Sequence, residues 1–344
     1  MKLIKPSFKI WNQPAGLEGV YKQIEKVGRV CYKSEDKMTE DSAKPFVERM
    51  TKSGHGAMLE HGTVYLKVTN KGLSLDNYDK NQVENKYISN PYSKVIFGKY
   101  PKYNSYEEKL EATQEVYITT NYRVLVENGW LDDLKYLCEP TEFHEKRVTV
   151  HFVCDRGVSH EFVRHRVMSF AQESTRYCNY SKDKFGNEIT FIIPCWLDIP
   201  EGKAYWHDGI NYRVGVTEEN IFGESVNPKA WSNKESNCVE VHDYIQALDN
   251  AEKAYLRLMS AWENRVTDRR YVTGFKGNPW TPQQARAVLP NALKTELVMT
   301  GFVSDWNHFF DLRAKGTTGA PHPQAKELAE PLMKEFIARK YINN

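Results

Sequence analysis

The chain of 344 residues lacks several features that would place it in a simple class. Its six cysteines include no Cys-x-x-Cys pair, which argues against a zinc site or a disulfide framework and favours reduced thiols. It has no apolar run of about eighteen residues and no signal-peptide start, so we expect a cytoplasmic protein with no membrane contact. With 47 basic and 45 acidic residues, it also lacks the positive excess typical of nucleic-acid-binding proteins, and we expect no nucleic-acid partner.

Nucleotide and metal motifs are missing too. No Gly-x-Gly-x-x-Gly follows a strand and no P-loop occurs, so a dinucleotide would not be bound in the Rossmann manner. A helical zinc motif needs two histidines four residues apart on one face. His160 and His165 are five residues apart, and His55 and His61 are six apart. The sequence therefore predicts no metal.

Helical periodicity is clear in several segments. Apolar residues from Leu17 to Cys31 recur every three or four positions, which is typical of an amphipathic helix. Thr281, followed by Pro and then by Gln284, predicts a capped helix start. The other predicted helices are 41–53, ending before Gly54; 244–262; 281–290; a short one capped by Ser304 or Asp305 with Arg313 in its last turn; and 323–341.

Alternating apolar residues predict strands at 64–68 and 148–154, and we expect these two strands to pair. A strand followed by a helix is predicted over 116–127, closed by Gly129, and a further strand over 294–303.

The segment Arg164–Arg176 is the most informative part of the chain. It holds three arginines, a histidine, three hydroxyl side chains, an amide and a single carboxylate. Charge-assisted hydrogen bonds from guanidinium to phosphate contribute about 1.5–3 kcal/mol each. We interpret the segment as a site for a phosphate-bearing small molecule.

The order Arg-His-Arg, seven residues, then Ser is also a family signature. Here it is Arg164–Arg166 followed by Ser174, and the sequence resembles the flavin-dependent thymidylate synthases. The resemblance covers roughly residues 15–70, 147–195 and 242–340. Its other matching segments are Gly28–Tyr32, Gly54–His61, Asp155–Gly157, Glu161–Arg164, Arg286–Pro290 and Arg313.

The resemblance implies an α+β fold, with one domain over residues 1–344 and a central antiparallel sheet flanked by helices. Two segments, about 70–146 and 197–241, lie outside the resemblance and are interpreted as insertions. The family also implies a homotetramer with active sites shared between subunits.

The resemblance implies a role for each matching residue. Arg313 would be catalytic. Deoxyuridine monophosphate (dUMP) would be bound by Glu161, Arg164, Glu173, Ser174, Thr175, Arg176, Arg286 and Arg313. FAD would be bound by His55, Ala57, Arg164, His165, Arg166, Gln172, Ser304, His308 and His322. Departures from the commoner family pattern are Ala171, Gln172, Phe302 and Ser304.

The implied reaction is methylation of dUMP to thymidine monophosphate (dTMP). FAD, NADPH and 5,10-methylenetetrahydrofolate would take part. An arginine is always protonated and can stabilise negative charge that develops on the uracil ring, which suits Arg313.

Cys195 tests the alternative chemistry, since cysteine-dependent thymidylate synthases use a Pro-Cys-His nucleophile. Here Trp196 replaces the His, and the apolar flanks predict an inert core cysteine. Two other functions remain open. One is a nucleic-acid-binding module in which Arg164, Arg166 and Arg176 contact backbone phosphates. The other is a flavoprotein of the same fold with a changed acceptor.

Overall fold

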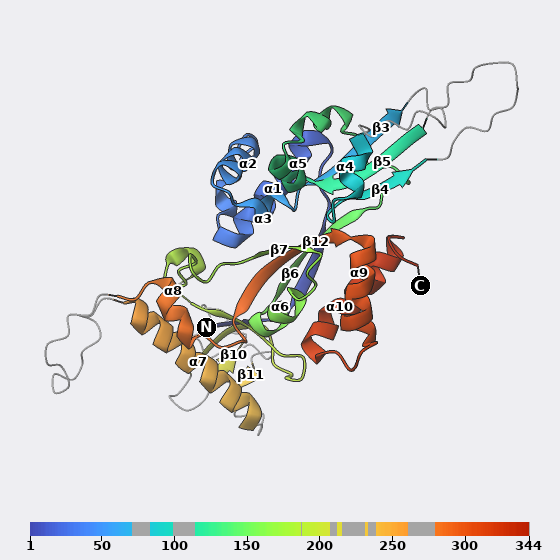
Figure 1. Ribbon diagram of the computed structural model, residues 1–344. Coiled ribbons are helices and arrows are strands. Elements are labelled where there is room, and N and C mark those ends of the chain that lie inside the picture. The colour runs from blue at the N-terminus through green and yellow to red at the C-terminus, as the bar shows by residue number, and fades with distance from the viewer. Residues whose placement is uncertain are drawn as a thin grey trace, which may run out of the picture.

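A computed structural model gives the fold of the chain. It describes residues 1–70, 83–98, 114–186, 188–206, 212–214, 231–232, 239–260 and 279–343. Within these ranges the strands form three sheets, with helices packed against them (Figure 1).

The central sheet has the strand order β2-β6-β12-β7, and all neighbouring strands are antiparallel. Its strands are β2 (Ser7–Trp11), β6 (Arg147–Asp155), β7 (Ser169–Gln172) and β12 (Lys294–Phe302). The alternating residues Val148, Val150 and Phe152 of β6 are all buried in one core cluster. The predicted α+β class, with a central antiparallel sheet, is confirmed.

Helices cover both faces of this sheet (Figure 1). On one face, Trp306 is completely buried among aromatic side chains, and its indole N–H donates to the Val148 carbonyl at 3.1 Å. On the other face, Val27 and Val30 pack against Val298. The first face carries α6 (Arg156–Phe162), α9 (Val303–Phe310) and α10 (Pro323–Ala338), and the second carries α1 (Gly16–Tyr32), with α2 (Ala43–Lys52) and α3 (Gly56–Leu59) beside it.

A three-stranded antiparallel sheet has the order β3-β5-β4. Its strands are β3 (Thr63–Asn70), β4 (Lys94–Phe97) and β5 (Gln114–Asn121). The predicted pairing of 64–68 with 148–154 is wrong, because Val64 of β3 is paired with Thr120 of β5. Alternation shows that a strand has a buried face but does not select its partner.

The third sheet has the order β11-β10-β9-β1-β8, and its β1–β8 pair is parallel. Tyr255 of α7 is fully buried against it in a second core cluster. The elements are β1 (Lys2–Ile4), β8 (Thr190–Ile192), β9 (Gly202–Trp206), β10 (Tyr212–Val214), β11 (Trp231–Ser232) and α7 (Val239–Met259). Trp262, where we predicted that this helix ends, lies outside the described residues.

Most predicted helices are confirmed within a few residues, and α5 ends at Gly129, whose φ of 70° suits glycine. The predicted cap at Thr281 is present, with the Thr281 N–H donating to Gln284 Oε1 at 2.9 Å. The remaining short helices are α4 (Val83–Ile88), α5 (Tyr122–Asn128), α8 (Pro282–Ala285) and the 3-10 helices Glu35–Lys37, Leu131–Tyr136, Asp183–Phe185 and Arg286–Val288.

The start of α9 corrects one prediction. Phe302, and neither Ser304 nor Asp305, is the N-cap residue. Asp305 lies in the first turn, where its carboxylate accepts the Phe302 N–H at 3.1 Å. Arg313 lies beyond α9 in a π-helical turn, Asp311–Lys315.

The structure describes only part of the two predicted insertions. The positions that it does not describe there are 71–82, 99–113, 207–211, 215–230 and 233–238. Within the first, Val116, Ile118 and Leu125 are built into the core beneath the β3-β5-β4 sheet. That these segments are insertions, within one domain over 1–344, stays a prediction. No described helix combines the length and the apolar character needed to cross a membrane.

Candidate active site

The cation-rich segment is divided by a strand. Its residues Ser169–Gln172 form β7, in which Ser169 lies opposite Thr300 and Gln172 opposite Leu297 of β12. Before β7, α6 is capped by Asp155, whose Oδ1 accepts the Val158 N–H at 2.8 Å. The segment therefore presents Arg164–Arg166 ahead of the strand and Glu173–Arg176 beyond it.

Arg313 is brought to the first of these groups. Its Nη1 donates to Glu161 Oε2 at 2.6 Å, and its Nη2 donates to the Glu161 carbonyl at 2.9 Å. Its Nε donates to His165 Nε2 at 3.3 Å. Arg313 thus forms one group with Glu161 and His165, which lie far from it in sequence. This group is here called the Arg313 cluster.

His165 is buried, and the hydrogen bond from Arg313 requires its Nε2 to be unprotonated. Burial, reinforced by the positive charge of Arg313 and by His308, lowers the pKa of His165 to about 4. The two histidine rings lie 5.8 Å apart. His165 is therefore neutral at pH 7 and accepts a hydrogen bond from Arg313.

Beside this cluster lies an open cavity of about 390 Å³. Arg313, Glu161 and His322 contribute to its wall, together with the loop from Thr318 to Pro321. A second cavity of about 310 Å³ shares Glu161 and His322. The Arg313 guanidinium, paired with Glu161, thus lies beside space for a small molecule.

Arg164, Arg166 and Arg176 are exposed. None of them forms an ion pair with a carboxylate in the described part of the chain. Positive groups without an internal counter-ion suit an external anion, which agrees with the sequence interpretation.

Beyond β7, backbone contacts hold the next predicted group. The Ser174 N–H donates to the Cys31 carbonyl at 3.0 Å, at the end of α1. Arg286 Nη1 donates to Thr175 Oγ1 at 3.2 Å. Ser174 Oγ accepts the Arg176 N–H at 3.3 Å. The structure therefore brings Ser174, Thr175, Arg176 and Arg286 together.

Two other predicted residues have their polar atoms engaged within the protein. Gln172 Nε2 donates to Ser159 Oγ at 2.8 Å and to Thr295 Oγ1 at 3.2 Å. Glu173 is buried, its Oε1 accepts the Tyr180 hydroxyl at 2.9 Å, and its Oε2 accepts the Lys294 ammonium at 2.8 Å. In this chain both carboxylate oxygens of Glu173 therefore accept hydrogen bonds from other side chains of the protein.

The remaining predicted flavin residues are dispersed. His55 and Ala57 lie exposed at α3, where His55 Nδ1 is 3.3 Å from the Tyr32 hydroxyl. Ser304, at the start of α9, donates to Glu145 Oε1 at 2.5 Å. His308 and His322 are exposed near the Arg313 cluster. Within one chain, the described side chains predicted to bind flavin therefore do not line a single pocket.

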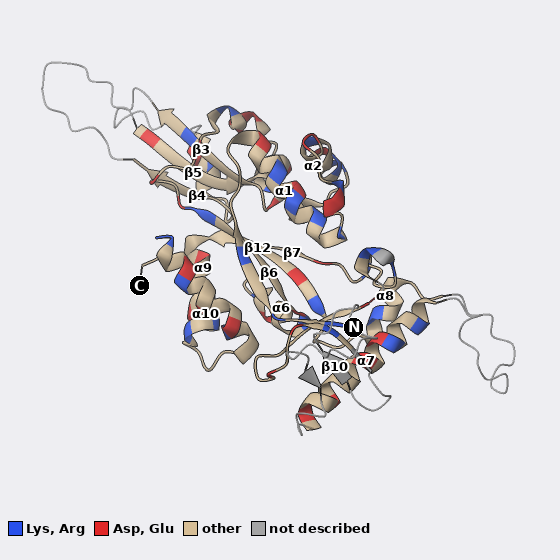
Figure 2. Cartoon of the chain, turned by 180° about the vertical axis from the view of Figure 1, so that it is seen from behind, with Lys and Arg blue, Asp and Glu red and all other residues tan. Residues whose placement is uncertain are grey.

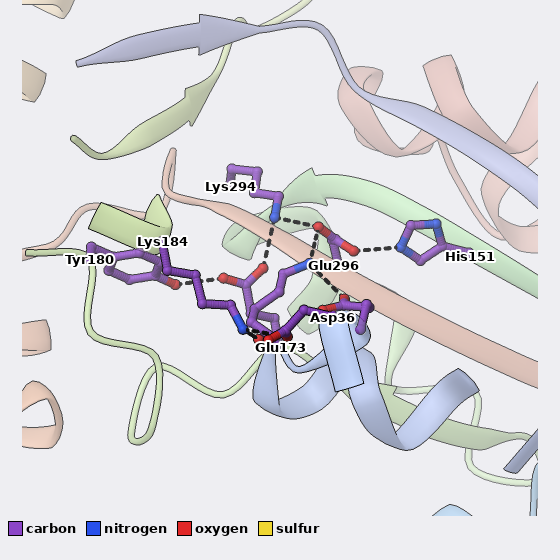
Figure 3. Close-up of polar contacts among 9 residues, drawn as sticks. Asp36, His151, Glu173, Tyr180, Lys184, Lys294 and Glu296 are labelled. Atoms are coloured by element: carbon purple, nitrogen blue, oxygen red, sulfur yellow. Dashed lines mark hydrogen bonds and ion pairs between the residues drawn. The ribbon is translucent and has the colours of Figure 1, made fainter. Parts of the chain in front are cut away.

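Sequence reasoning missed a group of partly or fully buried polar side chains around Glu173 (Figure 3). It is formed by Lys33, His151, Glu173, Lys294 and Glu296 and is here called the charge network. Lys33 also donates to Glu296, and His151 Nε2 lies 2.8 Å from Glu296 Oε2. Burial acts to raise the pKa of Glu296, but the His151 hydrogen bond and the lysine charges outweigh it and hold that pKa well below its usual range. The available signal was Lys294 and Glu296, two positions apart within an apolar strand.

Cys195 corrects a prediction. Its side chain is exposed and not part of the core, and the neighbouring Trp196 is 59% exposed. Partial burial still raises the pKa of the thiol, so it is not activated as a nucleophile.

Comparisons with known proteins match a large part of the chain to one family. The sequence model described as thymidylate synthase complementing protein matches residues 103–339. The flavin-dependent thymidylate synthase of Corynebacterium diphtheriae is 25% identical over 160 residues, which are 46% of this chain and 45% of that protein. The one from Mycobacterium marinum is 28% identical over 183 residues, covering 53% of this chain and 54% of that protein.

The chain thus spans about half the length of these relatives. Among solved structures, the UMP/dUMP methylase PolB from Streptomyces cacaoi, bound with 5-Br dUMP, aligns at 14% identity with a TM-score of 0.37. That alignment covers 98% of this chain and 93% of the other.

Proposed function

We propose, from the fact that this chain belongs to the thymidylate synthase complementing protein family, that it is a flavin-dependent thymidylate synthase. The reaction is methylation of dUMP to dTMP with 5,10-methylenetetrahydrofolate as carbon donor and NADPH as reductant. The observation that carries the proposal is the Arg313 cluster, which presents a guanidinium to an open cavity.

The chemistry explains why an arginine is needed. Carbon 5 of uracil is a weak nucleophile until electron density moves into the ring. One route adds a cysteine to the ring, but Cys195 is an exposed thiol with a raised pKa and is followed by Trp196. The other route stabilises negative charge at N3 and O4 of the ring, and a fixed guanidinium does so effectively away from bulk water. We assign that role to Arg313.

The dUMP phosphate would be bound by the group beyond β7. Arg176 and Arg286 supply the positive charge, and Ser174 and Thr175 supply hydroxyls. Glu161 and Arg164 complete the proposed substrate contacts near the ring. Arg286 already contacts Thr175, so part of this group is positioned before a substrate arrives.

The donor set ahead of β7 fits FAD. Arg164 and Arg166 are exposed cations without described carboxylate partners, which suits a pyrophosphate, and the neutral His165 lies between them in sequence. Bound flavin would supply the hydride that completes the methyl group. The other flavin contacts that we propose are His55, Ala57, Gln172, Ser304, His308 and His322.

Assembly into a homotetramer with shared sites also belongs to the proposal. Arg164 and Arg176 lie on opposite sides of β7, and His55 lies at α3. Flavin and substrate ligands drawn from such separate places in one chain would converge if a second subunit contributed some of them.

Two measurements test the proposal. The purified protein should be yellow, with an oxidised-flavin absorption band. It should also release tritium from C5-labelled dUMP when methylenetetrahydrofolate and NADPH are supplied. A colourless protein that cannot be reconstituted with FAD would contradict the flavin assignment. A yellow protein that releases no tritium would instead indicate a flavoprotein with another acceptor.

A further inference from the structure

Lys294 connects Glu173 to Glu296 within the charge network, and no role has been assigned to it above (Figure 3). Its ammonium donates to Glu173 Oε2 at 2.8 Å and to Glu296 Oε1 at 2.5 Å. Its side chain is only 16% exposed, and that of Glu173 is 1% exposed. Lys294 therefore joins two carboxylates that solvent barely reaches.

The position of Glu173 links this network to the proposed phosphate site. Glu173 immediately precedes Ser174, and its backbone N–H donates to the Glu296 carbonyl at 2.8 Å. Ser174 is held on its other side by the Cys31 carbonyl of α1. The chain leading into Ser174–Arg176 is thus fixed between β12 and α1, and the Glu173 side chain is its anchor.

Charge balance adds a second constraint. Lys33 pairs with Glu296 and with the more exposed Glu35, so among the described ion pairs Glu173 has Lys294 as its partner. Burial works against the charged form of Lys294, but the two carboxylates outweigh it and raise the pKa of this ammonium. Without Lys294, a buried carboxylate would lie next to the residues that receive a phosphate dianion, and like charges at close range oppose binding.

We infer that Lys294 is a positioning residue for the phosphate of dUMP: it anchors and neutralises Glu173, so that Ser174–Arg176 can accept an anion. This inference rests on the proposed function. Lys294 acts through Glu173 and does not touch the substrate.

The experiment compares Lys294→Met with Lys294→Arg in the full-length holoenzyme. We expect Lys294→Met to raise the Michaelis constant for dUMP about tenfold, equivalent to about 1.4 kcal/mol, with a smaller change in kcat. Lys294→Arg keeps the positive charge beside Glu173 and should bind dUMP better than Lys294→Met. The double variant Lys294→Met with Glu173→Gln removes both charges and should bind dUMP better than Lys294→Met alone.

Lys86→Met is the matched control. Lys86 pairs with buried Asp133 at 2.5 Å beside the three-stranded sheet, far along the chain from the proposed site. The Lys86→Met variant should have a lower midpoint temperature of unfolding and an unchanged Michaelis constant for dUMP. If Lys294→Met also lowers only the thermal midpoint, or if the double variant binds dUMP no better than Lys294→Met, Lys294 is not a positioning residue. A wild-type enzyme that binds neither flavin nor dUMP would refute the proposed function itself.

Discussion

The charge network pairs its lysines with glutamates inside the protein, whereas ahead of Ser169 the guanidiniums of Arg164 and Arg166 are exposed. Glu173 of the network follows the four-residue strand β7 and Arg166 precedes it, whereas Lys294 and Glu296 lie on the neighbouring strand β12. Balanced buried charges fix the backbone, because each has a partner that it cannot leave without cost. Exposed cations without described carboxylate partners remain available to a ligand. Paired buried charges therefore hold the backbone of the site in place, and the exposed cations are the groups that can contact a ligand.

Basic and acidic side chains are interleaved along α1 and α10, as Figure 2 shows. Many of these charges form pairs four residues apart, such as Lys22 with Glu18 and Arg339 with Glu335. Such exposed pairs contribute little to stability. The contrast with Arg164 and Arg166 therefore lies in the absence of a described acidic partner and not in exposure alone.

The largest expected effect is at Arg313, which differs from Arg164 and Arg166 in being paired with Glu161. Arg313→Ala should lower turnover about 100- to 1,000-fold, because it removes the donor that stabilises charge on the uracil ring. Flavin absorption should persist, since the Arg164 and Arg166 guanidiniums remain. Steady-state kinetics and the visible spectrum measure the two quantities. Lys315→Ala, in the same turn and paired with Asp311, is the control. Undiminished turnover of Arg313→Ala would remove Arg313 from catalysis.

The next effect concerns Arg176, which follows β7 and is exposed like Arg164 and Arg166. Arg176→Ala should weaken dUMP binding about ten- to a hundredfold, the loss expected for one charge-assisted phosphate contact. Isothermal titration with dUMP, and with deoxyuridine as the ligand that lacks the phosphate, measures this loss. Deoxyuridine should bind both proteins equally. Equal weakening for both ligands would show that Arg176 acts on the fold and not on the phosphate.

The next prediction concerns the protonation of His165 and the pH dependence of stability. His165 has a pKa of about 4 in the folded chain, below the ordinary histidine value, so the unfolded chain takes up a proton first as the pH falls. Its contribution to stability is therefore complete above about pH 6.5 and is lost as the pH falls towards 4. His61, buried with a pKa of about 3, adds to the same trend.

The measurement is the free energy of unfolding from pH 7 to pH 4. His165→Gln should reduce its slope, because His165 no longer titrates, while His61 and His144, whose pKa values burial also lowers, still do. The carboxylate of Glu296 should matter only below the ordinary glutamate pKa, since its own pKa is depressed. An unchanged slope in His165→Gln would mean that His165 is not buried as a neutral ring.

Much of the fold was predictable because periodicity is a local property. The helix over Leu17–Cys31 and the strand over 148–154 follow from the spacing of apolar residues alone. The partner of β3 did not follow, since strand pairing depends on where distant segments return. The Arg313 cluster was predicted as a set of residues by resemblance, but its hydrogen bonds were not.

The charge network was missed for a related reason. Lys33, His151 and Glu296 lie on three separate elements, and none of them stands out in its own segment. Cys195 was misplaced because apolar neighbours in sequence do not decide burial in space. Local pattern therefore identifies elements and charged segments, while the balance of buried charges needs the tertiary structure.

The smallest expected effect tests whether the thiol belongs with the reactive groups. Cys195 is exposed and adjoins Pro194 and Trp196, which line a cavity shared with Glu161 and His322. Cys195→Ser should change turnover by no more than about twofold, as for an ordinary surface substitution. Alkylation of the wild-type protein, followed by the same assay, separates loss of nucleophilicity from steric block of the cavity. A collapse of turnover in Cys195→Ser would assign the chemistry to the thiol and not to the Arg313 guanidinium, and the reaction would then proceed through covalent addition to the ring instead of charge stabilisation.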